Sequence, residues 1–152
     1  MGALGKSILI IEDSDTMRSF FAQVVKRLGF ENVYASSTVE STASLDLTSV
    51  DVVLLDWLLP GTNGATFTKR VRAGKTRLPV SVLIVLVTGH ADQKLVAEAR
   101  ECGVDTILVK PVSGQQLESR IKAALIARAA APAGTPPEPP ASGTESGPPS
   151  EQ

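Results

Sequence analysis

The sequence predicts an α/β fold: a doubly wound, five-stranded parallel sheet with five helices, in three layers. Short runs rich in β-branched residues alternate with stretches of helical periodicity, a pattern typical of parallel strands joined by crossover helices. The 152 residues have room for one ordinary domain, and a hydrophobic content of 43% is enough to build its core. The longest apolar run, residues 82–87, is far shorter than the roughly 20 residues of a membrane span, so we expect it to be a buried strand.

The other strands are also expected at short apolar runs. The segments SILII at residues 7–11 and VVLL at residues 52–55 are the clearest, because a strand covered by helices on both faces is apolar throughout. A shorter run at residues 33–36 predicts the second strand, and residues 106–109 predict the fifth.

The first helix is the most strongly marked in the sequence. It begins at Ser14 or Asp15, either of which can cap its first turn, and it stops at Gly29. Its apolar residues recur at helical spacing: Met17, Phe20, Phe21, Val24, Val25 and Leu28. A weaker helix is expected over residues 38–47, whose Ser and Thr side chains compete with the helical backbone for hydrogen bonds.

Three more helices follow the third, fourth and fifth strands. Residues 65–72 predict one directly after the loop PGTNG. Asp92 is the expected N-cap of the next, and Gly103 its stop. Ser113 and Gln116 have the spacing of a capping box, which predicts the start of the last helix.

The domain is expected to cover residues 1–131, and residues 132–152 are expected to be a disordered, proline-rich tail. Seven of the ten prolines lie between Pro132 and Pro149, in a stretch without aromatic, large aliphatic or basic residues. Such a composition cannot bury a core. Because nothing after Ala131 could fold into an output domain, we expect a stand-alone domain whose output passes through a partner.

Charge and cysteine content exclude several classes of protein. Lys and Arg number 15 against 16 Asp and Glu, so there is no electrostatic case for binding nucleic acid. The N-terminus lacks the hydrophobic region of a secretory signal, and we expect no membrane insertion. The lone cysteine, Cys102, lies on an apolar helical stripe and is expected to be a buried core thiol. A cytoplasmic location fits these observations.

Chemically active side chains follow four of the five expected strands. Glu12 and Asp13 follow the first strand, Asp56 the third, Thr88 the fourth and Lys110 the fifth. In a doubly wound sheet, ligands bind outside the carboxyl ends of the strands, where these side chains would meet. Each residue alone has an ordinary explanation, since acids cap helices and lysines are usually solvated. Their joint placement has none.

This set of residues predicts metal-dependent phosphoryl chemistry. Crowded carboxylates repel one another, and a hard divalent cation bound by oxygen ligands, Mg²⁺, would offset that repulsion. The Asp56 carboxylate could then attack a phosphoryl group and form an acyl phosphate. Lys110 would supply a second positive charge, and the Thr88 hydroxyl a hydrogen bond, to the phosphoryl oxygens.

With these residues, the chain resembles the CheY-like receiver domain of bacterial response regulators over about residues 7–130. The acid pair of that family matches Glu12 and Asp13, its phosphorylated aspartate Asp56 in LLDWLLPGTNG, its threonine Thr88 in VTGH, and its lysine Lys110 in VKP. The resemblance implies a flavodoxin-like sheet with strand order 2-1-3-4-5. It also implies that the phosphoryl group comes from a sensor histidine kinase or a histidine phosphotransfer protein.

The resemblance further implies a ligand set for Mg²⁺. Asp13 and Asp56 would bind the cation directly, Glu12 partly through water, and the main-chain carbonyl of Leu58 would complete the protein ligands. Two backbone features are implied as well: a cis peptide bond at Lys110–Pro111 and a flexible loop that contains Gly61 and Gly64.

The sequence departs from the family pattern at three positions. Leu58 and His90 stand two residues after the phosphoacceptor and the threonine, at positions that govern phosphoryl lifetime in the family. Leu58 could shield the acyl phosphate from water, and His90 is expected to be a solvated loop residue. Ile107 occupies the place of the family's aromatic switch residue, which moves inward as the threonine, here Thr88, meets the phosphoryl group.

The leading hypothesis is therefore a receiver that signals through phosphorylation-dependent binding of a downstream protein. The alternative is an adaptor that uses the same fold without phosphorylation. We expect no enzyme activity on external substrates, because Leu58 stands where an aspartate-based phosphatase carries its second acid. The segment AGKT at residues 73–76 lacks the opening glycine of a nucleotide-binding loop, since position 69 is Lys69.

Overall fold

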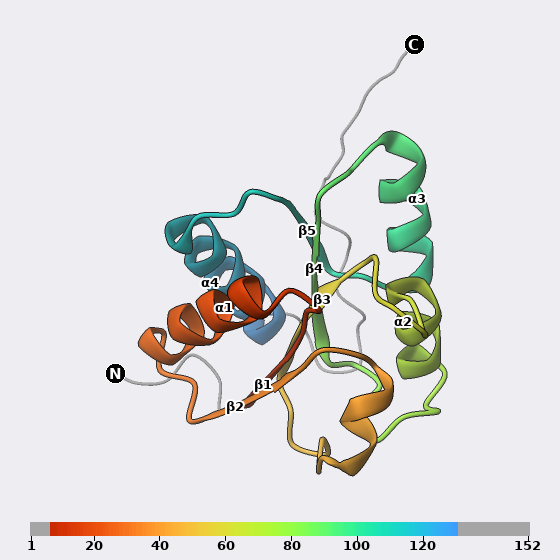
Figure 1. The fold of residues 1–152 in the computed structure, drawn as a ribbon, viewed down its shortest axis with the longest axis horizontal. Helices are drawn as coiled ribbons and strands as arrows, with labels where there is room; N and C mark the ends of the chain where they lie inside the picture. Colours follow the sequence, from red (N-terminus) through yellow and green to blue (C-terminus); the bar gives the residue numbers. More distant parts are fainter. Residues whose placement is uncertain (1–6, 131–152) are drawn as a thin grey trace.

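The computed structural model describes residues 7–130 and contains one parallel sheet between two layers of helices. Figure 1 shows α1 and α4 on one face of the sheet, with α2 and α3 on the other. The strands lie in the order β2-β1-β3-β4-β5, which confirms the predicted fold class and strand order. The strands are β1 (Ser7–Ile11), β2 (Asn32–Ser36), β3 (Val52–Asp56), β4 (Leu83–Thr88) and β5 (Thr106–Val109). The helices are α1 (Asp15–Arg27), α2 (Gly64–Arg72), α3 (Gln93–Cys102) and α4 (Gly114–Ala130).

The central strands are apolar along their length because both faces of the sheet are covered. Every residue of β1, β3 and β4 is buried. Along β1, Ile8 and Ile10 face the core beneath α1 and α4, whereas Leu9 and Ile11 face the core beneath α2 and α3. This two-sided burial holds the strand ends rigidly, and the candidate site residues lie at those ends.

Helix ends follow the capping signals in the sequence. The Ser14 hydroxyl accepts a hydrogen bond from the Met17 amide at 3.3 Å and is the N-cap of α1. Ser113 and Gln116 form the expected capping box at the start of α4. The Ser113 amide donates to the Gln116 side-chain oxygen at 2.9 Å, and the Gln116 amide donates to the Ser113 hydroxyl at 3.1 Å. Gly103 ends α3 with a φ of 108°, a left-handed conformation that favours glycine. Asp92 also caps α3 as predicted.

The prediction of an α-helix over residues 38–47 was wrong. That segment forms only a short 3₁₀ helix, η1 (Glu40–Ser44), so the described residues hold four α-helices rather than five. Thr38 and Ser41 bond to each other through side chain and backbone, and the Thr42 hydroxyl donates to the Val39 carbonyl at 2.7 Å. These local bonds replace the backbone pattern of an α-helix.

The remaining differences from prediction are small and concern the ends of strands and helices. Strand β2 and helix α2 begin one residue earlier than predicted, β3 ends one residue later, and β4 is shifted by one residue at both ends. Cys102 is 5% exposed, which confirms the prediction of a core thiol. The proline-rich tail lies outside the described residues. Within the described range, no helix combines the length and apolar character that a bilayer span requires.

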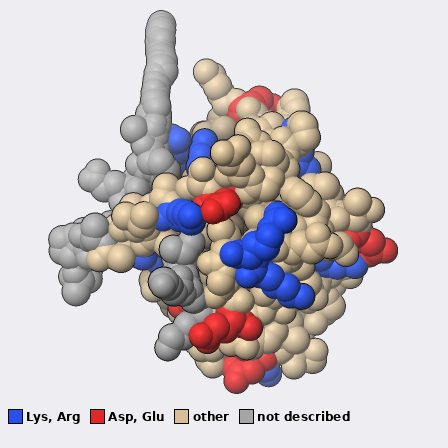
Figure 2. Space-filling view, turned by 90° about the vertical axis from the view of Figure 1, so that its left-hand side faces the viewer, with Lys and Arg blue, Asp and Glu red and all other residues tan. Residues whose placement is uncertain are grey.

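The surface carries charge of both signs. Figure 2 views the face on which α1 and α4 lie, and basic side chains gather near its middle with acidic side chains around them. This mixture agrees with the nearly equal counts of basic and acidic residues in the sequence.

A glycine-to-alanine pair tests the packing behind Asp56. A Cβ at Gly64 would lie 3.0 Å from the Trp57 Cα and 3.1 Å from the Asp56 carbonyl oxygen, and neither backbone atom can move aside cheaply. We expect Gly64→Ala to lower the free energy of unfolding by about 1–3 kcal/mol in urea denaturation. Gly89→Ala is the control, because a Cβ there meets nothing within 4 Å. Equal stability of the two variants would contradict this account.

Candidate functional site

Four neighbouring strands bring the candidate residues to one edge of the sheet. Glu12 directly follows β1, and Asp56 ends β3, which lies beside it. Asp56 is in register with Val87, so Thr88 at the end of β4 lies one position further along. Lys110 directly follows β5, and its amide donates to the Thr88 carbonyl at 2.8 Å.

Three carboxylates form the acidic part of this site. One oxygen from each of Glu12, Asp13 and Asp56 lies within 4.8 Å of the others. Glu12 is 1% exposed and Asp56 7% exposed, whereas Asp13 faces solvent. The Glu12 carboxylate also accepts a bond from the Ser14 amide at 3.1 Å, which fixes its orientation. A crowded, all-oxygen, half-enclosed donor set of this kind fits a hard divalent cation such as Mg²⁺.

Lys110 supplies the positive charge of the site. Its Nζ lies 3.0 Å from Glu12 Oε1 and 3.6 Å from Asp56 Oδ2, so it contacts both buried acids. Burial by itself would lower the pKa of Lys110, but its contacts with Glu12 and Asp56 together outweigh burial and raise the pKa. The ammonium therefore stays charged at neutral pH and offsets part of the repulsion between the acids.

Asp56 is held in an environment that disfavours its charged form. Burial, and next the negative charge of Glu12, raise the pKa of Asp56 from 3.8 to about 6. The positive charge of Lys110 and a hydrogen bond from the Leu58 amide at 3.3 Å act in the opposite direction but do not cancel the rise. A bound cation would favour the carboxylate in the same way as Lys110 does.

Thr88 has its hydroxyl in the turn that follows β4. The residue is 1% exposed, and its Oγ1 donates to the His90 carbonyl at 3.1 Å and accepts from the His90 amide at 3.2 Å. The His90 ring is largely exposed and lies 3.1 Å from Asp92, in agreement with the expected solvated position. Thr88 is thus at the predicted strand end, and its role toward a phosphoryl group stays a prediction.

The backbone around the acids and Lys110 has features that the resemblance to receiver domains implies. The Lys110–Pro111 peptide bond is cis, and Gly61 has a φ of 76°, which favours glycine. Leu58, on the loop after β3, is 71% exposed. Ile107 is half-buried on β5 and packs against the core beneath α2 and α3, so no aromatic ring occupies this position.

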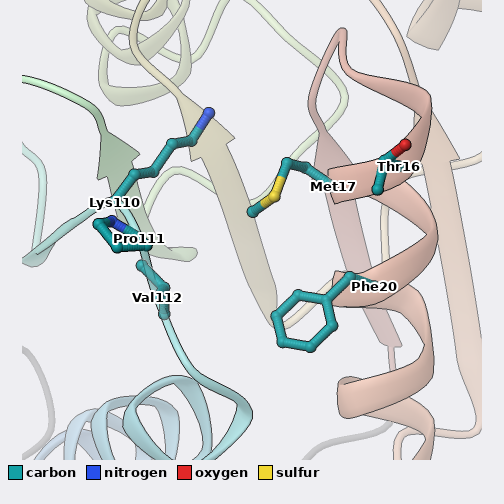
Figure 3. Close-up of a pocket in the computed structure, with 6 residues that line it drawn as sticks. All are labelled: Thr16, Met17, Phe20, Lys110, Pro111 and Val112. Atoms are coloured by element: carbon teal, nitrogen blue, oxygen red, sulfur yellow. The ribbon is translucent and has the colours of Figure 1, made fainter.

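An apolar pocket of about 560 Å³ lies next to Lys110. Its lining comes from α1 and from the segment after β5: Thr16, Met17, Phe20, Lys110, Pro111 and Val112. In Figure 3, Met17 and Phe20 point from α1 toward Pro111 and Val112, while the Lys110 side chain reaches away from Pro111 and Val112. The charged cluster therefore has an apolar neighbour on its α1 side.

Two residues near the site were missed by the sequence analysis. Arg18 donates to the Glu12 carbonyl at 2.9 Å and thereby fixes the turn between β1 and α1. Glu40, on η1, accepts hydrogen bonds from the Thr62 amide and hydroxyl, in the loop after Asp56. No local pattern in the sequence signals either contact, because each joins segments whose proximity depends on the folded chain.

Comparisons with known proteins agree on one family. The family model for the response regulator receiver domain matches residues 8–122. Phosphate regulon transcriptional regulatory protein PhoB of Pseudomonas aeruginosa is 31% identical over 122 residues, which are 80% of this chain and 52% of PhoB. Sensory transduction protein RegX3 of Mycobacterium tuberculosis is 32% identical over 119 residues, or 78% of this chain and 50% of RegX3.

A solved structure shows the same fold. Chemotaxis protein CheY4 of Vibrio cholerae superposes with a TM-score of 0.70 at 21% identity, over 79% of this chain and 98% of that one. The chain spans about half the length of the curated relatives it matches.

The raised pKa of Asp56 leads to a prediction about stability without metal. Because the pKa in the folded chain, about 6, is above the ordinary 3.8, charging this carboxyl costs folding free energy. The cost is absent when the group is protonated in both states, and it develops as pH rises from about 4 to about 6. We expect Asp56→Asn to be more stable than the parent protein by about 1–2 kcal/mol at pH 7.5.

Urea denaturation in EDTA from pH 4.5 to 7.5 measures this difference. The gap between Asp56→Asn and the parent should widen as pH rises. Glu31→Gln is the control, since Glu31 is exposed beside the start of β2, at the opposite end of the sheet. A gap that is independent of pH, or a parent protein more stable than the variant at pH 7.5, would contradict the assignment.

Proposed function

This chain belongs to the response regulator receiver domain family, and we propose that it accepts a phosphoryl group on Asp56 in a Mg²⁺-dependent reaction. Receiver domains are signalling domains that take phosphoryl groups from histidine kinases, and they generally bind Mg²⁺ at an acidic pocket. The proposed donor is a phosphohistidine on a sensor histidine kinase or on a histidine phosphotransfer protein.

A single observation carries the proposal: a buried aspartate at a strand end lies between two further acids and a lysine. Asp56 Oδ2 is 3.6 Å from the Lys110 ammonium, and its carboxylate shares a cluster with Glu12 and Asp13. A carboxylate needs such flanking charges to attack a phosphoryl group, because its own charge repels the phosphoryl oxygens. An aspartate placed only for stability would not require this arrangement.

The proposed step transfers the phosphoryl group from nitrogen to oxygen. An Asp56 carboxylate oxygen forms a bond to phosphorus while the bond from phosphorus to the donor imidazole nitrogen breaks, and that nitrogen keeps the electron pair. Lys110 would hold one phosphoryl oxygen by a charge-assisted hydrogen bond. The Thr88 hydroxyl would give up its bond to the His90 carbonyl and donate to a second phosphoryl oxygen. No general base is required, since Asp56 reacts as the carboxylate.

Mg²⁺ would be held by Asp13, Asp56 and the Leu58 carbonyl, with Glu12 acting partly through water. When bound, the cation supplies positive charge that offsets the crowded acids and the transferring oxygens. Glu12 would then bind the cation in place of its present contact with Lys110. We propose that this frees Lys110 to move toward the phosphoryl group.

Output would depend on the charge that phosphorylation adds. A phosphoryl group carries close to two negative charges, and these would bias Thr88 and the surface beside Ile107 between two states. With isoleucine at this position, any change in packing is transmitted by a smaller side chain than the aromatic residue of the family pattern. A downstream protein that reads this surface would complete the signal.

Several finer expectations stay predictions. The stand-alone arrangement is one, because the chain spans about half of PhoB and RegX3. The absence of a nucleic-acid partner is another, since PhoB is by name a transcriptional regulatory protein. The cytoplasmic location is a third.

A direct test is incubation with Mg²⁺ and a small-molecule phosphodonor, followed by intact-mass measurement. We expect a gain of one phosphoryl group that is lost in EDTA and in Asp56→Asn. Glu31→Gln serves as the control and should be phosphorylated at the parental rate. No gain, or a gain that survives Asp56→Asn, would favour the phosphorylation-independent adaptor.

The Leu58 side chain provides a second test, on phosphoryl lifetime. Because it is apolar and lies two residues after Asp56, we propose that it keeps water from the acyl phosphate. Leu58→Asn is expected to shorten the lifetime of the acyl phosphate by roughly twofold to tenfold. This is less than the roughly hundredfold or larger rate increase that a positioned general base contributes. Val80→Asn changes another exposed apolar residue, just before β4 at the other end of the sheet, and should leave the lifetime unchanged. An unchanged lifetime in Leu58→Asn would contradict the shielding role.

A further inference from the structure

We propose that Glu40 is a positioning residue that holds the loop between β3 and α2, and thereby presents the Leu58 carbonyl to the bound cation. This inference rests on the proposed function, because it concerns the same cation site. The hydrogen bonds of the Glu40 carboxylate run to Thr62 and not to the acids of the cluster. It would act only through the loop of residues 57–63.

This loop is fixed at both ends but carries exposed residues between them. At its start, the Leu58 amide donates to Asp56 Oδ1 at 3.3 Å. At its end, the Gly64 amide donates to the Trp57 carbonyl at 3.0 Å, and Asn63 caps α2. Leu58, Pro60 and Gly61 are exposed. Trp57 and Leu59 are buried on either side of Leu58, so the exposed part of the loop that follows them is where a contact from another segment would limit movement of the Leu58 carbonyl.

Glu40 makes that contact. Its Oε2 accepts a bond from the Thr62 amide at 3.1 Å and another from the Thr62 hydroxyl. The loop also approaches the same carboxylate at Gly61, where a Cβ would lie only 3.0 Å from Glu40 Oε1. The Thr62 hydroxyl bond is the main reason that the pKa of Glu40 lies below its ordinary value, so the carboxylate is fully charged at neutral pH.

Glu40 is well placed to hold the loop because its own backbone is fixed. It follows Val39, which is 9% exposed and packs in the same core cluster as Trp57 and Leu59 of the loop. Two residues later, Thr42 is buried and its hydroxyl donates to the Val39 carbonyl at 2.7 Å. The short 3₁₀ helix is thus a rigid support, and the glutamate side chain connects it to the loop.

A set of variants separates hydrogen bonding from charge. Glu40→Ala removes both bonds to Thr62, whereas Glu40→Gln keeps an acceptor oxygen but loses the charge. Glu31→Ala is the matched control, because it removes one exposed glutamate near the start of β2, at the other end of the sheet. Trp57, the single tryptophan, adjoins Asp56 and can report Mg²⁺ binding by its fluorescence.

We expect Glu40→Ala to weaken Mg²⁺ binding by roughly threefold to tenfold. The loss of affinity is smaller than the roughly tenfold to hundredfold typical when a residue hydrogen-bonded to a metal ligand is removed. Glu40→Gln and Glu31→Ala should remain within about twofold of the parent protein. Hydrogen exchange of the Thr62 amide, measured in EDTA, should be faster in Glu40→Ala and unchanged in Glu40→Gln. The thermal midpoints in EDTA should agree, since the contact is on the surface.

Parental Mg²⁺ affinity in Glu40→Ala would overturn the proposal. So would equal weakening in Glu40→Ala and Glu40→Gln, because that result assigns the effect to charge alone. Both outcomes leave the proposed function intact if the parent protein is phosphorylated on Asp56. Conversely, a parent protein that binds Mg²⁺ but takes no phosphoryl group defeats the proposed function and leaves the Glu40 test valid.

Discussion

The repulsion between crowded carboxylates at one end of the sheet is the constraint on which the site depends. Oxygens of Glu12, Asp13 and Asp56 lie within 4.8 Å of one another, and two of these residues are almost fully buried. Lys110 offsets them from within the cluster, at 3.0 Å from Glu12 and 3.6 Å from Asp56. Burial, and next the negative charge of Glu12, raise the pKa of Asp56, and the excess of negative charge makes a cation favourable at this position. The proposed cation binding and phosphoryl acceptance would thus have one electrostatic origin.

The fold maintains this unfavourable arrangement because the sheet positions it. Strands β1 and β3 are neighbours, and the chain crosses to opposite faces after them, with α1 on one face and α2 on the other. Ligand sites of doubly wound sheets form where the crossover direction reverses in this way. The buried side chains along β1, β3 and β4 hold the strand ends in place, so the acids cannot separate to relieve their repulsion.

Much of this arrangement could be predicted from sequence, for identifiable physical reasons. The runs SILII and VVLL identify buried strands, and Asp92, Ser113 and Gly103 mark helix ends through local hydrogen bonds and backbone conformation. The residues of the site follow from strand ends alone. Residues 38–47 were misassigned because their hydroxyl side chains bond locally, so that a 3₁₀ turn forms instead. The contact of Glu40 with Thr62, and the closer pairing of Lys110 with Glu12 than with Asp56, depend on loop and side-chain geometry with no sequence signal.

The most direct measurement of the central claim is the titration of the Asp56 side-chain carboxyl by NMR, with and without Mg²⁺. Its resonance can be assigned by its loss in Asp56→Asn. The electrostatic account predicts a midpoint near 6 without the cation, and a midpoint below about 4 with saturating Mg²⁺. A midpoint near the ordinary 3.8 that Mg²⁺ leaves unchanged would contradict it.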